Sequence, residues 1–243
     1  MFFKNPEGQD LFCKYFQKSQ SKEIYILCHR NGSSIDCSIY PLLGKNLSVN
    51  IFGFDFPGHG KSQGTYNYAG FLQQAKDLQS AYLFLKAQGF QVKGVIAHSK
   101  AANVAIIHNA AFGTIPNVIA VAPRYFMGEF PALFLPKYRK IARKGKAKVQ
   151  TAKGKETVTM DMLKERMSVD MKCYCQKCSG NLFIVHGRED DNCPVTDAHM
   201  FVQALGSHLM QLHIVTGDDS FENNTDNLVE ALEEIFTCIN ECI

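Results

Sequence analysis

The sequence has no hydrophobic run long enough to span a membrane, for which about 18 consecutive apolar residues are needed. The opening segment, MFFKNPEGQDLF, carries a charge at Lys4 followed by Pro and Gly, so it lacks the apolar core of a signal peptide. The formal net charge is only +3, which does not by itself indicate a nucleic-acid partner. We therefore expect a cytoplasmic protein with no membrane span and no nucleic-acid partner.

Disulfides are not expected either, although the chain has nine cysteines. The number is odd, and without an export signal the thiols are expected to stay reduced. Only Cys173, Cys175 and Cys178 are clustered, in the pattern C-x-C-x-x-C. A tetrahedral zinc site usually needs a fourth ligand, and no Cys or His follows within the next few residues. We expect buried or half-exposed thiols here, with a metal site as the less favoured alternative, and no metal or cofactor in the protein.

The composition is that of a globular protein, with 46% hydrophobic and 20% charged residues. Short apolar runs predict strands at 23–29, 48–55, 94–98, 117–122, 181–187 and 210–217. Helical periodicity between these runs predicts helices at 67–88, 99–112, 194–206 and 223–240. Strands that alternate with helices predict an α/β fold, with a mainly parallel sheet flanked by helices. At this length we expect a single domain over residues 1–243.

The segment 124–175 interrupts this alternation and is expected to form a small basic lid inserted between two strands. Within it, residues 136–156 contain nine Lys or Arg and no acidic residue before Glu156. The favoured interpretation is a solvated basic face. The alternative is a lid that steers anionic substrates or partners toward the site.

The stretch VIAHSKAANVAII, residues 95–107, places Ser99 between an apolar run and a helix of small residues. One interpretation is a nucleophile elbow, a sharp strand-to-helix turn that needs small residues two positions before and after the serine. Ala97 and Ala101 stand at those positions, where glycine is usual. The other interpretation is an ordinary helix N-cap. The motif alone does not decide between them.

Two flanking motifs favour the elbow. FDFPGHGKSQG, residues 54–64, follows the second apolar run, and FIVHGREDDNCPVTDA, residues 183–198, contains a strand, His-Gly, Asp190 and Pro194. Together with AHSKAA, residues 97–102, these motifs resemble the α/β-hydrolase superfamily. The resemblance is to its serine-aminopeptidase-like or esterase-like branch, whose elbow reads G-H-S-K-G-G.

This resemblance implies an α/β-hydrolase fold and assigns a role to several residues. Ser99 would be the nucleophile and Asp190 the acid that orients the base, with Asp191 as the alternative acid. The backbone N–H groups of Asn31 and Lys100 would form the oxyanion hole. The partner would be a small-molecule ester or amide, as substrate or ligand.

The histidine that the mechanism uses as its base is missing from the expected place. In the loop TGDDSFENN, residues 216–224, Ser220 occupies the position of the family histidine. His59 is the least implausible substitute base. Other histidines considered as substitutes are His98, His199, His208 and His213. Departures from the family pattern also occur at Arg30, Ala97 and Ala101, all on the catalytic apparatus.

Two functions therefore remain open. The first is a serine hydrolase that cleaves an ester or small amide through an acyl-enzyme on Ser99. The second is a catalytically inactive hydrolase-fold protein that binds a small ligand or a partner protein. Recognition of acidic lipid headgroups or nucleic acid by the basic segment ranks last.

Overall fold

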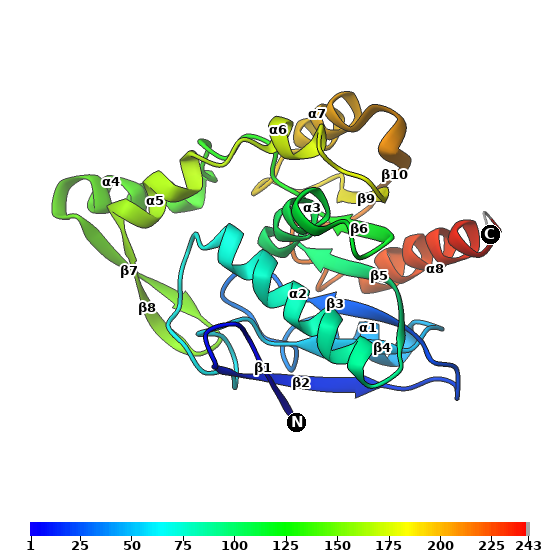
Figure 1. The fold of residues 1–243 in the computed structure, drawn as a ribbon. Helices are drawn as coiled ribbons and strands as arrows, with labels where there is room; N and C mark the ends of the chain where they lie inside the picture. The colour runs from blue at the N-terminus through cyan, green and yellow to red at the C-terminus, as the bar shows by residue number, and fades with distance from the viewer. Residues whose placement is uncertain (242–243) are drawn as a thin grey trace.

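The computed structural model describes residues 1–241, and its main sheet has eight strands in the order β1-β2-β4-β3-β5-β6-β9-β10 (Figure 1). β2 runs antiparallel to both of its neighbours, and the remaining strand pairs are parallel. The strands of this sheet are β1 (Phe2–Lys4), β2 (Asp10–Phe16), β3 (Glu23–Cys28), β4 (Ile51–Phe54), β5 (Gln91–His98), β6 (Asn117–Val121), β9 (Asn181–Gly187) and β10 (Leu209–Val215). The six strands predicted from the apolar runs are all present, and the mainly parallel sheet is confirmed.

Helices cover both faces of this sheet (Figure 1). They are α1 (Tyr40–Asn46), α2 (Phe71–Ala87), α3 (Lys100–Phe112), α6 (Met171–Cys175), α7 (Val195–Leu205) and α8 (Thr225–Glu241). α2, α3 and α7 pack on one face, and α1 and α8 pack on the other. Within β5, Val95 and Ala97 point to the first core and Ile96 to the second, because side chains alternate along a strand. This two-sided burial explains why the parallel strands are apolar throughout.

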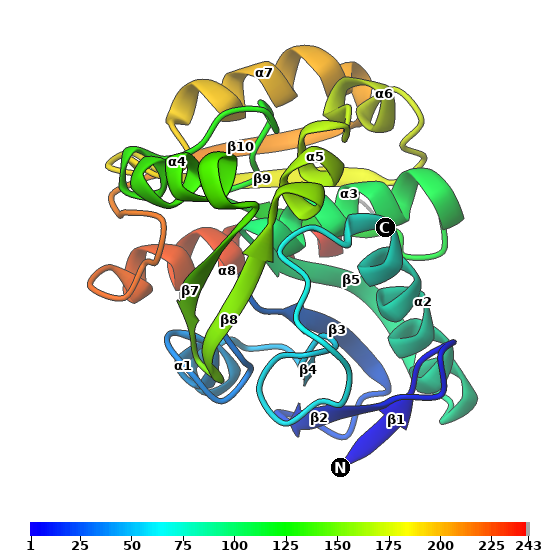
Figure 2. The same ribbon diagram turned by 90° about the vertical axis from the view of Figure 1, so that its left-hand side faces the viewer.

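The segment between β6 and β9, residues 122–180, is called the insertion below. It contains a short 3-10 helix (Ala132–Phe134), α4 (Leu135–Lys144), the hairpin β7 (Lys146–Thr151) and β8 (Gly154–Thr159), α5 (Met160–Met167) and α6. The sequence patterns did not predict the hairpin. Figure 1 shows α4, α5 and the hairpin on the side toward which β5 points, and Figure 2 shows the hairpin in front of the sheet.

The insertion has a small core of its own, formed mainly by Ile141, Val158 and Leu163, and Tyr66 packs into it. The hairpin tip is tied to the rest of the fold. The amide of Ala152 donates to the carbonyl of Gly32 across 2.6 Å. The Lys153 ammonium donates to the carbonyl of Ser62 across 3.1 Å. The insertion therefore rests against the loops at the carboxyl ends of the parallel strands.

The basic residues of 136–156 point mostly to solvent. Eight of the nine are exposed and Lys137 is half-buried. On α4 the apolar Ile141 faces the insertion's core, which leaves the basic side chains on the outer face. This arrangement agrees with the favoured interpretation of a solvated face. None of the described helices combines the length and hydropathy needed to cross a bilayer.

Candidate active site

Ser99 occupies a strained turn between β5 and α3. Its backbone has φ 57° and ψ −121°, and its side chain makes no capping hydrogen bond to the helix. A positive φ is costly for a residue other than glycine and persists only where the surroundings enforce it. Here the Ser99 amide donates to the Val121 carbonyl across 2.7 Å, and the Ser99 carbonyl accepts from the Ala102 amide across 2.9 Å. The geometry is that of an elbow and not of an ordinary N-cap.

The alanines on either side fit this turn. Ala97 and Ala101 are both buried, at 0% and 2% exposure. Their methyl groups lie in the core that α2 and α3 form with the sheet, where a larger side chain would have no space. The departures from glycine at these two positions therefore leave the elbow in place.

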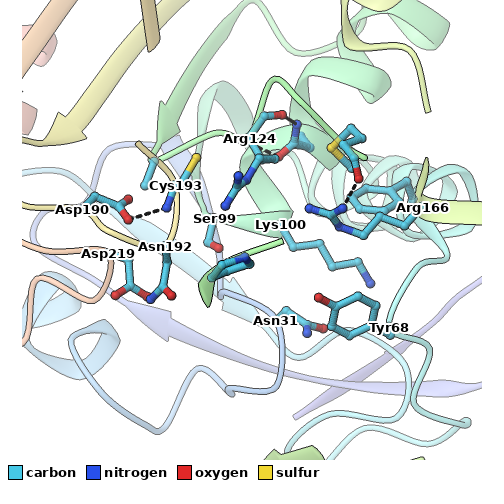
Figure 3. Close-up of a pocket in the computed structure, with 15 residues that line it drawn as sticks. Asn31, Tyr68, Ser99, Lys100, Arg124, Arg166, Asp190, Asn192, Cys193 and Asp219 are labelled. Carbon is cyan, nitrogen blue, oxygen red and sulfur yellow. Dashed lines mark hydrogen bonds between the residues drawn. The ribbon is translucent and has the colours of Figure 1, made fainter. Parts of the chain in front are cut away.

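Ser99 lines two cavities. The first, of about 210 Å³, is also lined by Asn31, Lys100, Asp190 and Asp219, among others (Figure 3). The second, of about 410 Å³, lies between the hairpin tip and the loop that follows β3. The structure thus brings Ser99, Asp190, Asn31 and Lys100 to one cavity.

Asn31, in the loop after β3, and Lys100, directly after Ser99, both line the cavity. The amide of Lys100 belongs to the first residue of α3, whose amide has no acceptor within the helix. Asn31 is held by a hydrogen bond from its Nδ2 to the Tyr66 hydroxyl, across 2.9 Å. Both residues line the cavity with Ser99, so their amides are candidates to bind an oxyanion there.

Arg30, one of the departures from the family pattern, is held in the loop after β3 by several contacts. Its amide donates to the Tyr40 hydroxyl across 2.6 Å. Its guanidinium lies 3.5 Å from the Asp219 carboxylate and 3.2 Å from Glu222. The side chain also lines the second cavity. Its positive charge offsets the negative charges of Asp219 and Glu222 in the loop after β10.

Asp190 is buried beside Ser99, with 4% of its surface exposed. Its Oδ1 accepts a hydrogen bond from the Cys193 amide across 2.6 Å, and its Oδ2 has no hydrogen-bond partner among the described residues. Burial, with a smaller contribution from the charge of Asp219, raises the pKa of Asp190 to about 7. Asp191, the alternative acid, is exposed and is not among the residues that line the cavity.

The loop after β10 contains Ser220, which was expected at the position of the family histidine. Ser220 does not line the cavity, because its hydroxyl donates to the Asp218 carboxylate across 2.8 Å. The same carboxylate accepts from the amides of Ser220 and Phe221, which fixes the loop. Asp219 is the residue of this loop that faces the cavity, together with Asp190 and Ser99.

None of the described residues that line the two Ser99 cavities is a histidine. His59 is 2% exposed, and its Nδ1 bonds to the Pro57 carbonyl. Burial lowers the pKa of His59 to about 2, which makes it a very weak base. His98 is occupied by the Tyr40 hydroxyl and the Asp219 carbonyl. The other histidines considered as substitutes, His199, His208 and His213, do not line either cavity.

Among residues 1–241, one group of three potential metal-ligating side chains has its ligand atoms within 4.8 Å of one another. The group consists of His186, Asp190 and Cys193. Its atoms already bond within the protein, since His186 Nε2 bonds to the Cys193 carbonyl across 2.7 Å and Cys193 Sγ to the Pro123 carbonyl across 3.1 Å. These contacts give the group a structural role, which is to hold Asp190 in place.

The clustered cysteines do not form such a group within the described residues. Cys175 and Cys178 are buried, and Cys173 is half-buried. Burial raises the pKa of both Cys175 and Cys178 to about 12, so their thiols stay protonated and unreactive.

Comparison with known proteins identifies the fold. The structure resembles Est1E from Butyrivibrio proteoclasticus, with a TM-score of 0.74, 16% identity and 98% of each chain covered. It also resembles the Pyrococcus furiosus esterase Pf2001, with a TM-score of 0.73, 18% identity and coverage of 98% of this chain and 89% of the esterase. The hypothetical protein PA2218 from Pseudomonas aeruginosa gives a TM-score of 0.77 at 13% identity, over 100% of this chain and 92% of that one.

In sequence, the human alpha/beta hydrolase domain-containing protein 17B is 27% identical over 127 residues. The match spans 50% of this chain and 39% of the human protein's length. No family model matches the chain. The chain has the α/β-hydrolase fold.

Sequence reasoning missed three residues of this α/β-hydrolase-fold site. They are Asp219, Arg124 and Arg166, which all line the cavity. The strong run of positive charge at 136–156 lies instead on side chains that are mostly exposed. Arg124 directly follows the fourth apolar run, at the carboxyl edge of the sheet, and this was the available signal.

Proposed function

We propose that the chain binds a small carboxylic ester or amide at Ser99 and hydrolyses it slowly through an acyl-enzyme. The observation that carries this proposal is the strained Ser99 backbone at a cavity that Asn31 and Lys100 also line. In this scheme Ser99 Oγ attacks the carbonyl carbon, and the amides of Asn31 and Lys100 bind the resulting oxyanion. Collapse of the oxyanion breaks the ester or amide bond, and the alcohol or amine leaves with the proton that the Ser99 hydroxyl gave up. Water then attacks the acyl-enzyme, releases the acyl group as a carboxylic acid and restores the Ser99 hydroxyl.

The rate is low because the serine hydroxyl has no efficient base. A side chain that removes the hydroxyl proton must lie within reach and have a pKa near the working pH. Burial lowers the pKa of Lys100 to about 7, but its ammonium group donates to the Asn67 carbonyl across 2.9 Å. Asp219 is paired with Arg30. Loss of a triad member typically lowers kcat by ~10⁴-fold.

Hydrolysis of p-nitrophenyl acetate tests the proposal. Wild-type turnover is expected barely above the uncatalysed rate, with Ser99→Ala lowering it by less than about tenfold. Prolonged incubation followed by mass spectrometry of peptides is expected to find one acetyl group on Ser99. Ser207→Ala, at an exposed serine, is the matched control. Rapid turnover that disappears in Ser99→Ala contradicts the account, because it requires an efficient base.

A second function, binding without catalysis, is favoured by the lack of a histidine among the described cavity-lining residues. Here the site holds a small ligand or a partner protein and Ser99 forms no covalent bond. The peptide experiment separates the two functions, since a binding protein carries no acetyl group on Ser99 after the same incubation.

Three further observations support the proposal. The residues AHSKAA at 97–102 favour the serine-aminopeptidase-like or esterase-like branch. One of the structural neighbours, at 18% identity, is an esterase by name. The insertion acts as a lid in this proposal, because Met127, Pro131 and Arg166 from it line the cavity beside Ser99.

A further inference from the structure

Arg124 is held rigidly at the cavity beside Ser99. Its backbone amide donates a hydrogen bond to Asn103 Oδ1 across 3.1 Å, and its backbone carbonyl accepts one from Asn103 Nδ2 across 2.6 Å. On the side chain, Nε lies 3.7 Å from the buried Asp197 carboxylate. Asn103 therefore fixes the backbone of Arg124, and Asp197 fixes the Nε end of its guanidinium.

The two terminal nitrogens of Arg124 remain available to a ligand. Within residues 1–241, the polar contact found for this side chain is the one through Nε with Asp197. Figure 3 shows the guanidinium extending from the loop after β6 toward Ser99. A guanidinium has five N–H donors in a planar fork, and a fork with its outer edge free matches the two oxygens of a carboxylate or phosphate.

Arg166, from α5 in the insertion, brings a second guanidinium to the same cavity. It is 7% exposed, and its nitrogens donate to the main-chain oxygens of Met127 and Glu129. The Phe130 ring packs against it, 4.5 Å from its carbon Cζ. These contacts satisfy donors but supply no negative charge, and no ion pair of Arg166 is found within the described residues. Burial and the charge of Arg124 both lower the pKa of Arg166.

The acidic groups nearby do not balance these two charges. Asp197 faces Arg124, and the Asp219 carboxylate is taken up by Arg30. Asp190 lines the cavity but is buried, which favours its neutral form. Arg166 is buried and the Arg124 side chain is 12% exposed, so a single dedicated carboxylate leaves the pair short of negative charge, which is unfavourable because a buried charge needs a partner. An anion in the cavity would supply that partner.

We infer that the cavity beside Ser99 binds an oxyanion, a carboxylate or a phosphate, on Arg124 and Arg166. This inference rests on the proposed function for its position and deepens it by naming the substrate class. The substrate is a small ester or amide whose anionic group sits on Arg124 while its carbonyl reaches Ser99. The cavity volume of about 210 Å³ limits that substrate to a small molecule.

Calorimetric titration with a matched pair of esters tests the inference. Monomethyl succinate carries an ester and a carboxylate, and dimethyl succinate is its uncharged counterpart. At low and constant ionic strength, the wild-type protein is expected to bind the monoester at least about tenfold more tightly. Equal affinity for the two esters overturns the inference, and this comparison requires no variant.

Variants then assign the preference to its residues. Arg124→Met is expected to remove the preference for the monoester, and Arg166→Met to reduce it. Arg124→Lys should keep part of the preference for the monoester, since lysine retains the charge without the planar fork. Arg139→Gln, on the exposed face of α4, should leave it unchanged. Melting curves show whether each variant is folded. A preference that survives in folded Arg124→Met and Arg166→Met proteins overturns the inference.

Competition by inorganic phosphate and by acetate separates the two kinds of oxyanion. Stronger displacement of monomethyl succinate by phosphate assigns the site to a phosphate group, and stronger displacement by acetate assigns it to a carboxylate. Either result supports the oxyanion site. Because all of these measurements report binding, they stand even if Ser99 forms no acyl-enzyme. Conversely, hydrolysis with no charge preference keeps the proposed function and overturns only this inference.

Discussion

The imidazole of His98 donates a hydrogen bond from Nε2 to the main-chain oxygen of Asp219, across 2.7 Å. Since a carbonyl only accepts, Nε2 carries the proton and Nδ1 accepts from the Tyr40 hydroxyl across 2.9 Å. The Tyr40 oxygen in turn accepts from the Arg30 amide across 2.6 Å. This buried chain links the elbow to the loop after β3 and to the loop after β10. Burial lowers the pKa of His98 to about 4, so it stays neutral near pH 7.

Tyr40→Phe should therefore weaken the fold as well as the site. The change removes one hydroxyl and leaves two buried groups, His98 Nδ1 and the Arg30 amide, without their partner. Each unsatisfied buried group costs about 1–3 kcal/mol, so the free energy of unfolding in urea should fall by about 2 kcal/mol or more. Tyr15→Phe is the matched control, because its hydroxyl bonds to Gln88 near the surface, across 3.3 Å. Equal losses in the two variants contradict the linking role.

Asp190 should give the stability a distinctive pH dependence. Its pKa is about 7 in the folded protein and about 3.9 when unfolded. Between these values the folded state holds the proton more tightly, so the stabilisation is complete below about pH 4 and is lost as the pH rises to 7. Relative to Asp190→Asn, the wild-type unfolding free energy should fall by about 2–3 kcal/mol from pH 5 to pH 8.

Urea unfolding of both proteins at the two pH values measures this difference. The exposed neighbour provides the control, since Asp191→Asn should show no such trend. A wild-type advantage that stays constant or grows with pH would mean that Asp190 is ionised in the folded protein at neutral pH.

An imidazole introduced at Asp219 should activate Ser99. Asp219 lines the cavity with Ser99 and Asp190, whereas the Ser220 hydroxyl is turned to Asp218. Asp219→His is therefore expected to raise p-nitrophenyl acetate hydrolysis at least about tenfold, and Ser220→His to raise it less. Asp219→Asn separates loss of the carboxylate from gain of the ring. The gain should vanish when Ser99→Ala is added, and a gain that persists there would refute the role of Ser99.

Six strands of the sheet were predictable from the sequence because parallel strands buried on both faces form continuous apolar runs, as at 94–98 and 117–122. The elbow was readable because Ser99 joins such a run to a helix. The edge strand β1 and its neighbour β2 were missed, because β1 has only three residues and the charged Asp10 and Lys14 interrupt the apolar residues of β2. The β7–β8 hairpin was missed because its lysines dominated the pattern at 146–155.

The composition of the cavity was the least predictable part. Asp219 and Ser220 are neighbours, and only the hydrogen bonds accepted by Asp218 decide which of the two faces Ser99. Arg124 and Arg166 lie 42 positions apart and meet because the insertion folds back over the sheet. Contacts between residues so far apart in the sequence depend on tertiary packing, and no periodicity in the sequence predicts them.

Labelling with a fluorophosphonate tests the central claim most directly, because the reagent reacts with a serine in proportion to its activation. The account places Ser99 on a nucleophile elbow without an efficient base. It predicts slow and incomplete labelling of the wild-type protein, confined to Ser99 and absent in Ser99→Ala, with faster labelling in Asp219→His. Rapid, stoichiometric labelling of wild-type Ser99 would contradict the account and show that the site already holds its base.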